Sequence, residues 1–278
     1  MEWWLSPSPN ISAICPQGLN FMKAKLDYEE ILKLQFTNAK EDPTKSYLED
    51  LYLEIVKRIS PSAFILEVGA GAGTSTLFLP NHNILRTDLI SANPVLVSEN
   101  VNVLDLGFKS GEFDAVIAID VIHHLSDPLR GLSQMCRVIK PNGKILLIEP
   151  YVSIFSFPIY KVFHQEKTSM FLRQRDLLQS ETKEPSLGNQ TIAQTVFKRK
   201  SLTTKLKDIL GPGAEISITY RDFIGFFATG GINKPLRTSG SFIRLVLKLE
   251  KNIPQSILKL IASRMIIEIN FDTREYTD

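Results

Sequence analysis

The fold class follows from one short stretch, Ile65-Leu66-Glu67-Val68-Gly69-Ala70-Gly71-Ala72-Gly73-Thr74. It begins as an apolar strand that carries an acid, turns through glycines at alternate positions and then leads into a polar segment. Glycine allows a sharp turn and lets the main chain approach a ligand without a side chain in the way. A helix that starts after such a turn offers unpaired N–H groups to a carboxylate or a phosphate. The stretch therefore predicts a strand, a ligand-binding turn and a helix in succession.

Short apolar runs alternate with longer mixed segments on either side of this turn. Several runs are apolar at consecutive positions, which is typical of parallel strands buried on both faces. The alternation predicts a doubly wound α/β domain with a mostly parallel sheet of seven strands. The expected strands are Phe64–Val68, Ile84–Thr87, Val101–Leu104, Ala115–Ile119 and Lys144–Glu149, with Glu215–Tyr220 and Met265–Phe271 closing the sheet.

Helical patterns flank these strands and suggest three parts. Apolar residues recur at helical spacing in Tyr28–Phe36 and Pro43–Ile59, and an amphipathic pair is expected at Ser241–Asn252 and Pro254–Ser263. Residues 151–190 mix aromatic and charged side chains. We expect an N-terminal helical cap at 1–60, a ligand-binding core at 61–150, and a helical and aromatic lid with the closing strands at 151–278.

The composition is that of a folded protein and gives little sign of a nucleic-acid partner. Of the 278 residues, 44% are hydrophobic and 22% are charged, and the net charge is only +2. Positive charge is concentrated in residues 161–208 and 237–264. These segments are interpreted either as solvated helix faces or as surfaces for an anionic acceptor or lipid. Cys15 and Cys136 offer no disulfide framework or metal spacing. We found no signal peptide or membrane span, and expect a cytoplasmic protein.

The glycine spacing separates two classes of ligand. A dinucleotide fingerprint requires G-x-G-x-x-G, whereas Gly73 comes one residue early here and Thr74 takes the place of the third glycine. Glu67 would repel a pyrophosphate but would attract an ammonium group. Spacing and charge both favour a nucleoside that carries an amino acid.

Acids follow other expected strands in the same way. Asp88 comes 21 residues after Glu67, at the distance where an acid can accept hydrogen bonds from ribose hydroxyls. Asp105 and Asp120 follow the next two runs. Ligands of open α/β sheets bind at the carboxyl ends of the strands, so we expect these acids to converge on one crevice.

These residues resemble the successive motifs of class I S-adenosylmethionine-dependent methyltransferases, which have a Rossmann-like fold. The resemblance covers about residues 62–150, in the family's order and spacing. It is carried by Ile65–Thr74, Asp105–Phe108, Glu112–Val116, Asp120–Leu125 and Val138–Leu146.

The resemblance implies a cofactor, S-adenosyl-L-methionine, and a set of residues that bind it. The methionine part would be held by Glu67, Gly69, Ala70, Gly71 and Gly73, and the ribose by Asp88 and Leu89. The adenine would lie beside Asp105 and Leu106, and the methyl-donor pocket would be lined by Asp120, Val121 and Ile122.

The rest of the chain resembles, more loosely, bacterial methyltransferases of surface-polysaccharide or glycolipid gene sets. The pieces that carry this likeness are Pro150-Tyr151, Ile159–Glu166, Gly188-Asn189-Gln190 and Gly230-Gly231. It implies methyl transfer, by O-methylation, to a small-molecule, sugar or glycolipid acceptor. The acceptor itself, the atom methylated and the oligomeric state do not follow from the sequence.

Histidines near the fourth expected strand are the candidates for catalysis. A hydroxyl acceptor needs a general base, and His123 and His124 follow Asp120 at the mouth of the expected crevice. We favour His124 over His123, and the alternative is that both pack beside Asp120. A metal site is not expected. His164 and Glu166 are a second, weaker pair.

Other functions compete with methyl transfer. One is an NAD(P)-dependent oxidoreductase, against which the early Gly73 argues; another is a non-catalytic protein that binds S-adenosylmethionine. The basic segments, together with Trp3 and Trp4, also raise the hypothesis of a lipid-attached acceptor and a peripheral contact with the inner face of a membrane. The alternative is a packed helical lid.

Overall fold

The computed structural model describes residues 18–163, 168, 190–233 and 235–272. A six-stranded sheet with the order β2-β1-β3-β4-β6-β5 runs through this part of the chain. Four neighbouring strands are parallel, β6 is antiparallel to β4, and β5 is antiparallel to β6. The strands are β1 Phe64–Val68, β2 Asn83–Thr87, β3 Phe113–Ile119, β4 Ile139–Pro150, β5 Ala214–Arg221 and β6 Arg264–Phe271.

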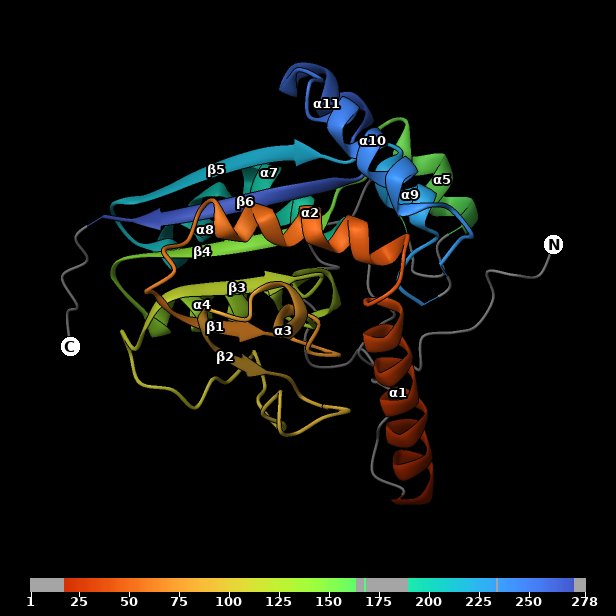
Figure 1. Ribbon diagram of the computed structural model, residues 1–278. Coiled ribbons are helices and arrows are strands. Elements are labelled where there is room, and N and C mark those ends of the chain that lie inside the picture. The colour runs from red at the N-terminus through yellow and green to blue at the C-terminus, as the bar shows by residue number, and fades with distance from the viewer. Residues whose placement is uncertain (1–17, 164–167, 169–189, 234, 273–278) are drawn as a thin grey trace.

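Helices cover both faces of the sheet, which gives the doubly wound α/β architecture that the sequence predicts (Figure 1). One face carries α2 (Thr44–Val56), α3 (Ser75–Phe78) and α10 (Gly240–Glu250), and the other α4 (Pro128–Val138), α7 (Ile192–Lys198) and α8 (Thr203–Leu210). The remaining elements are α1 (Gly18–Asn38), the 3-10 turns η2 (Ile122–His124) and η3 (Lys200–Leu202), α5 (Ser156–Phe163), α9 (Gly225–Thr229) and α11 (Gln255–Ile261).

The core explains why the strands are apolar at consecutive positions. Ile65 packs with the α2 and α10 side of the sheet, and its neighbour Leu66 packs with the α4 and α8 side. Ile117 and Val116 in β3 divide in the same way. Each of these four side chains is fully buried. Successive side chains of a strand point to opposite faces, so a strand covered on both sides needs an unbroken apolar run.

One strand expected from the sequence does not form. Residues Val101–Leu104 make a turn, in which the Asp105 N–H donates to the Asn102 carbonyl at 3.0 Å. The Asn102 side chain accepts a further hydrogen bond from the N–H of Leu104. Asparagine stabilises turns through such local bonds, which compete with pairing in a sheet. The prediction of a strand here, and with it of seven strands, is wrong for the described residues.

The helix after the glycine turn is a single turn long. It spans only Ser75–Phe78, and Pro80 follows shortly after it. Proline disfavours helical backbone at the preceding residue, which limits α3 to a single turn. Most of the cover on this face therefore comes from α2 and α10, which lie at opposite ends of the sequence and pack against each other.

The other helical predictions are confirmed in position. The expected helix at Pro43–Ile59 is α2, the expected pair at 241–263 is α10 and α11, and Tyr28–Phe36 lies within α1. Among the described residues, none of the helices combines the length and the apolar character needed to cross a bilayer. Trp3, Trp4, His164, Glu166, Gly188 and Asn189 lie outside the described part of the chain.

Candidate functional site

The turn between β1 and α3 depends on glycine for its backbone conformation. Gly69, Gly71 and Gly73 have φ angles of +67°, +53° and +72°, in the left-handed region that residues with a side chain rarely adopt. A Cβ on Gly69 would also lie 2.4 Å from Cγ2 of Val121. The glycines therefore permit both the curvature of the turn and the close approach of the loop after β3.

Asp88, directly after β2, is joined to the glycine turn. Its Oδ2 accepts a hydrogen bond from the N–H of Gly71 at 2.7 Å, and its Oδ1 accepts one from the N–H of Leu89 at 2.7 Å. The N–H of Ala70 donates to the Thr87 carbonyl at 3.0 Å. Burial raises the pKa of Asp88, and the backbone N–H donors oppose that rise. Two regions predicted to share a ligand therefore lie side by side.

Glu67 is buried beneath the turn, with only 4% of its surface exposed. Its Oε2 accepts a hydrogen bond from the Ser75 hydroxyl, and the Nε of Arg86 lies 3.7 Å from the same oxygen. Burial raises the pKa of Glu67 to about 7, against the opposing effects of Ser75 and Arg86. Glu67 thus connects β1, β2 and α3. Its expected contact with an ammonium group stays a prediction.

Side chains from the N-terminal helices cover this turn. Leu32 of α1 is 1% exposed, and a Cβ on Gly71 would lie 3.7 Å from it. The Asp88 carboxylate helps to raise the pKa of Tyr28, after the larger effect of burial. Tyr52 of α2 shares a hydrogen bond of 2.8 Å with the Thr74 hydroxyl. Figure 1 shows α1 across the carboxyl ends of β1 and β2.

Asp120, at the carboxyl end of β3, is paired with the last strand of the sheet. It has a φ angle of +58°, and its Oδ1 accepts a hydrogen bond of 2.5 Å from Nη2 of Arg264. The Asp120 side chain is 41% exposed, whereas that of Arg264 is 4% exposed. A residue of the C-terminal half therefore contacts the predicted methyl-donor pocket.

Glu149, at the end of β4, organises the loop that carries the two histidines. Its Oε1 accepts hydrogen bonds from the N–H groups of Val121 and Ile122 at 3.0 Å and 2.7 Å. Its Oε2 lies 2.7 Å from Nδ1 of His123, and both side chains are buried. His124 is exposed at the same edge, with its ring centroid 4.1 Å from that of His123. The two adjacent histidines therefore occupy different environments.

Asp105 and Leu106 belong to the turn that replaces the expected strand. Asp105 is exposed, whereas Leu106 is 2% exposed. The Leu106 N–H donates to Oε1 of Gln134, and Arg137 donates to the Leu106 carbonyl, so α4 positions this turn. Their predicted contact with adenine is not tested by this geometry.

Several residues that build the site were missed from the sequence. Glu149 could have been found, because it is a further acid at the end of a predicted strand. Arg86 and Arg264 carried no comparable signal, because each meets its carboxylate only through the pairing of strands. Tyr28 and Tyr52 belong to helices whose position over the turn depends on the tertiary packing. In the part of the chain that the structure describes, no group of three or more His, Cys, Asp or Glu residues could hold a metal ion.

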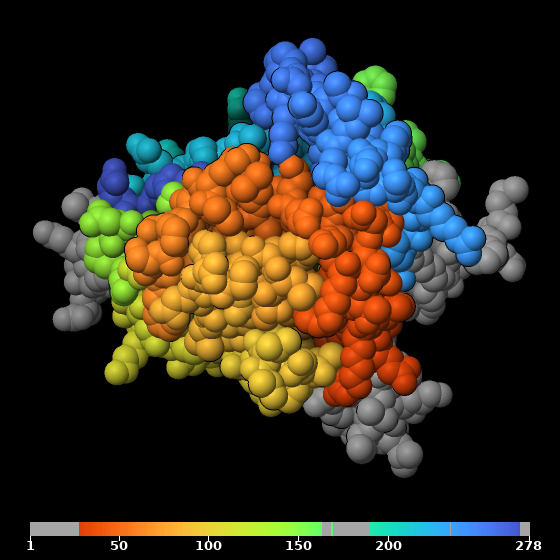
Figure 2. All heavy atoms as spheres, in the orientation of Figure 1, coloured from red at the N-terminus to blue at the C-terminus, as the bar shows by residue number. Residues whose placement is uncertain are grey.

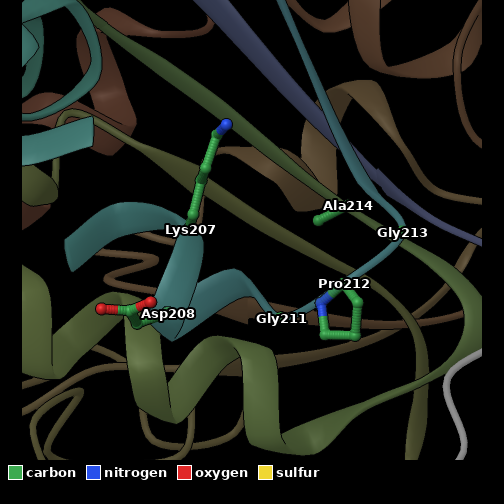
Figure 3. A pocket seen from close by; sticks show the side chains of 6 residues that line it. All are labelled: Lys207, Asp208, Gly211, Pro212, Gly213 and Ala214. Atoms are coloured by element: carbon green, nitrogen blue, oxygen red, sulfur yellow. The ribbon is translucent and has the colours of Figure 1, made fainter. Parts of the chain in front are cut away.

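A surface hollow lies far from these residues. It is found where α8 leads into β5, and Figure 3 shows the side chains that line it. Because β5 runs in the same direction as β1 and β3, its first residues lie at the edge of the sheet opposite the glycine turn. The hollow is therefore separate from the candidate site. It is lined by Lys207, Asp208, Gly211, Pro212, Gly213 and Ala214.

The fold and the turn define a class. A mostly parallel doubly wound sheet, a left-handed glycine turn after β1 and an acid after β2 that bonds to that turn are the features of a Rossmann-like nucleoside-binding domain. The early third glycine and Glu67 separate it from dinucleotide-binding domains.

Comparison with known proteins identifies this domain. Residues 66–147 form a methyltransferase domain by their match to that family. A solved S-adenosylmethionine-dependent methyltransferase from Archaeoglobus fulgidus has the same fold, with a TM-score of 0.50 and 11% identity over 84% of this chain and 97% of that one. The resemblance to class I S-adenosylmethionine-dependent methyltransferases, and the cofactor of that class, are thereby confirmed.

Curated relatives match only a part of the chain. It is 42% identical to probable polyketide synthase 10 of Dictyostelium discoideum over 59 residues, which are 21% of this chain and 2% of that protein. It is 27% identical to probable tRNA methyltransferase 9B of Bos taurus over 135 residues, or 42% of this chain and 29% of that protein. The chain thus spans less than a third of either relative.

Proposed function

We propose that this protein transfers the methyl group of S-adenosylmethionine to a small-molecule, sugar or glycolipid acceptor by O-methylation. The observation that carries the proposal is the bond between Asp88 and the N–H of Gly71 within a left-handed glycine turn. It places an acid that suits ribose hydroxyls beside main chain that a ligand can approach closely. The methyltransferase domain at residues 66–147 supports this reading over an oxidoreductase.

The residues present fit the cofactor by their chemistry. The glycine turn offers main-chain groups, Asp88 offers carboxylate oxygens to hydroxyl donors, and Glu67 offers a negative charge to the ammonium group. Asp120, Val121 and Ile122 line the pocket for the methyl donor in this proposal, with Asp105 and Leu106 beside the adenine. When bound, S-adenosylmethionine supplies an activated methyl group, so the chain has to align the acceptor and exclude water.

The histidines take different parts in this proposal. His124 is exposed at the carboxyl edge of the sheet, so we assign it the removal of the proton from an acceptor hydroxyl. His123 is buried against Glu149, so we assign it a positioning part in holding the loop after β3. The pair of Asp120 with Arg264 joins this loop to the C-terminal half, from which we expect the acceptor pocket to be built.

A binding experiment tests the cofactor site. S-adenosylhomocysteine, titrated by calorimetry, should bind the wild-type protein at micromolar concentration. Gly71→Arg should abolish this binding, because the new side chain occupies the space between the turn and Leu32. Gly213→Arg is the matched control, since Gly213 also has a left-handed φ angle, of +80°, and lies in the surface hollow at the opposite edge of the sheet. Equal affinity in all three proteins would remove the proposed site.

A transfer experiment tests the reaction. The wild-type protein is supplied with S-adenosylmethionine labelled at the methyl group, together with lipid, glycan and small-molecule fractions of a cell extract. We expect label in one of these fractions, and its loss in His124→Ala while S-adenosylhomocysteine still binds. Label that accumulates equally with His124→Ala contradicts the assignment of the base. Label in a nucleic-acid fraction alone contradicts the proposed acceptor class.

A further inference from the structure

Helix α10 has two apolar faces, of which only one is buried. Its inner face packs onto α2 and α9 through Gly240, Ile243 and Leu247. The large apolar side chains Phe242, Leu245 and Leu249 are instead 47%, 54% and 61% exposed. At 100° per residue these three lie within about 60° of one another on the outer side of the helix.

Helix α11, which follows α10 along the chain, also exposes apolar side chains. Ile257 and Leu260 are 48% and 50% exposed, three residues apart and therefore on one side of the helix. Figures 1 and 2 show α10 and α11, in blue, one after the other along the upper edge of the molecule. We call the outer side of the two helices the α10–α11 surface; its apolar members are Phe242, Leu245, Leu249, Ile257 and Leu260.

The exposed charges that α10 and α11 themselves carry are of one sign. Lys248 and Lys259 are exposed beside its apolar side chains, and Arg244 is exposed at the flank of α10, where its guanidinium donates to the Ser46 hydroxyl of α2. Between residues 237 and 264 the only acid is Glu250, which is 7% exposed and accepts hydrogen bonds from backbone N–H groups at the start of α9. No carboxylate from these two helices is therefore exposed to balance the cations.

We propose that the α10–α11 surface binds an anionic lipid bilayer. Exposed apolar side chains on amphipathic helices enter the boundary between headgroups and acyl chains, and neighbouring lysine and arginine side chains are attracted to anionic headgroups. A protein partner of matching charge would have to be acidic. We favour the bilayer because the apolar side chains are distributed along two successive helices that protrude at one edge of the molecule.

The surface adjoins the candidate site along the chain. Ile261, the last residue of α11, is followed closely by Arg264, whose guanidinium bonds to Asp120. Binding through α10 and α11 would therefore hold the carboxyl edge of the sheet near the bilayer. Only this consequence, access to a lipid-attached acceptor, rests on the proposed methyl transfer; the binding itself does not.

Co-sedimentation with vesicles tests the inference without cofactor or acceptor. The wild-type protein should pellet at low salt with vesicles of phosphatidylcholine and phosphatidylglycerol, and much less with phosphatidylcholine alone or at high salt. Leu245→Glu/Leu249→Glu and Lys248→Glu/Lys259→Glu should each lower the partition coefficient about tenfold or more. The matched control is Leu53→Glu/Val95→Glu, which places the same charges at exposed apolar positions outside the surface and should pellet like wild type.

Three outcomes would overturn the inference. Wild-type protein that stays in the supernatant with both kinds of vesicle shows that there is no bilayer contact. Equal loss of binding in the control variant shows that added charge, and not this surface, is responsible. A dimer in light scattering that Leu249→Glu dissociates shows that the surface joins two copies of the chain. Urea denaturation checks each variant for folding without any cofactor, so failure here is distinguishable from failure of the methyltransferase proposal.

Discussion

The glycine turn and a polar cluster between the end of β5 and the start of β6, made of Tyr47, Arg221 and Asp222, are held together in different ways. At the turn, three left-handed glycines and backbone N–H donors define the geometry. The buried Glu67 and the half-buried Asp88 bond to Ser75 and Gly71, which are 8 and 17 residues away. In the second cluster, the buried Asp222 accepts hydrogen bonds from Tyr47, which is 175 residues away, and from its neighbour Arg221. Arg221 also donates to Asp50 of α2, which is 171 residues away.

This difference separates what local sequence dictates from what tertiary structure dictates. Backbone geometry at the turn requires glycine at set positions, so it leaves a readable pattern. The packing of α2 against β5 and β6 decides which groups pair around Asp222, so these pairs leave no readable pattern in the sequence. We therefore expect substitutions at the turn to affect ligand binding, and substitutions in the cluster to affect mainly the free energy of unfolding.

The largest effect should come from Asp222→Asn. Asp222 is 3% exposed, with its Oδ2 2.6 Å from the Tyr47 hydroxyl and its Oδ1 3.0 Å from Nε of Arg221. Asparagine tolerates the φ angle of +58° there, so the substitution mainly removes the charge. Breaking a buried ion pair on one side should lower the free energy of unfolding by about 3 kcal/mol, measured by urea denaturation.

An exposed ion pair provides the matched control for the loss of this carboxylate charge. Asp114 and Lys140 are 2.8 Å apart, with side chains about 40% exposed, so Asp114→Asn should cost about 0.5 kcal/mol or less. The affinity of Asp222→Asn for S-adenosylhomocysteine should stay within about threefold of wild type under conditions where the variant is folded. A loss of affinity as large as the loss of stability would show that the two regions are not separate.

The second prediction concerns Gly69→Ala. The methyl group would meet Val121 at 2.4 Å, and the backbone would keep a φ angle of +67° that alanine disfavours. We expect the free energy of unfolding to fall by about 2 kcal/mol and the affinity for S-adenosylhomocysteine to fall at least about tenfold. Gly107→Ala, at an open position, should change neither. Wild-type affinity in Gly69→Ala would contradict the assignment of the turn to the cofactor.

The third prediction uses the raised pKa of Glu67. A carboxyl group whose pKa is about 7 in the folded protein keeps its proton at a pH where the unfolded chain has already lost it. Its contribution to stability is therefore present below about pH 4.5 and is lost as the pH rises to about 7, by at most about 1.4 kcal/mol per pH unit. Glu67→Gln should remove this dependence, measured as the difference between the two urea-denaturation profiles over pH 4.5–7.

The same group links protons to cofactor binding. An ammonium group near Glu67 favours the ionised carboxylate, so binding of S-adenosylhomocysteine at pH 6.5 should release up to about one proton. Calorimetry in buffers of different ionisation enthalpy measures this number, and Glu67→Gln should bring it near zero. Equal proton release in both proteins would contradict a contact between Glu67 and the ammonium group of the cofactor. The contacts of Glu67 would then be those with Ser75 and Arg86.

Much of the fold could be predicted because the relevant rules are local. Six of the seven expected strands formed, since their apolar runs reflect burial on both faces of a covered sheet. The run at Val101–Leu104 misled because it is too short to outweigh the turn that Asn102 stabilises. The convergence of Gly71 and Asp88 was predicted from the rule that ligands bind at the carboxyl ends of parallel strands.

The rest of the site depends on contacts across long separations in sequence. Arg264 reaches Asp120 across 144 residues, and no local pattern distinguishes it from other arginines at strand ends. The placement of α1 over Gly71 depends on where the N-terminal helices pack, which periodicity cannot tell. For the histidines, the sequence showed only two adjacent rings, and the difference in burial arises because Glu149 bonds to one of them.

The smallest effect should come from Tyr52→Phe, which tests a neutral bond at the turn against the charged bonds around Asp222. The Tyr52 hydroxyl lies 2.8 Å from the Thr74 hydroxyl, and its ring stacks on Phe78 with centroids 5.2 Å apart. Phenylalanine keeps the stacking and loses only the hydrogen bond, so the free energy of unfolding should fall by about 1 kcal/mol. Because Tyr52 contacts the turn without shaping its backbone, the affinity for S-adenosylhomocysteine should change less than in Gly69→Ala. A loss of 3 kcal/mol or more, as expected for Asp222→Asn, would show that the turn also depends on side-chain bonds, and the contrast between the two regions would then fail.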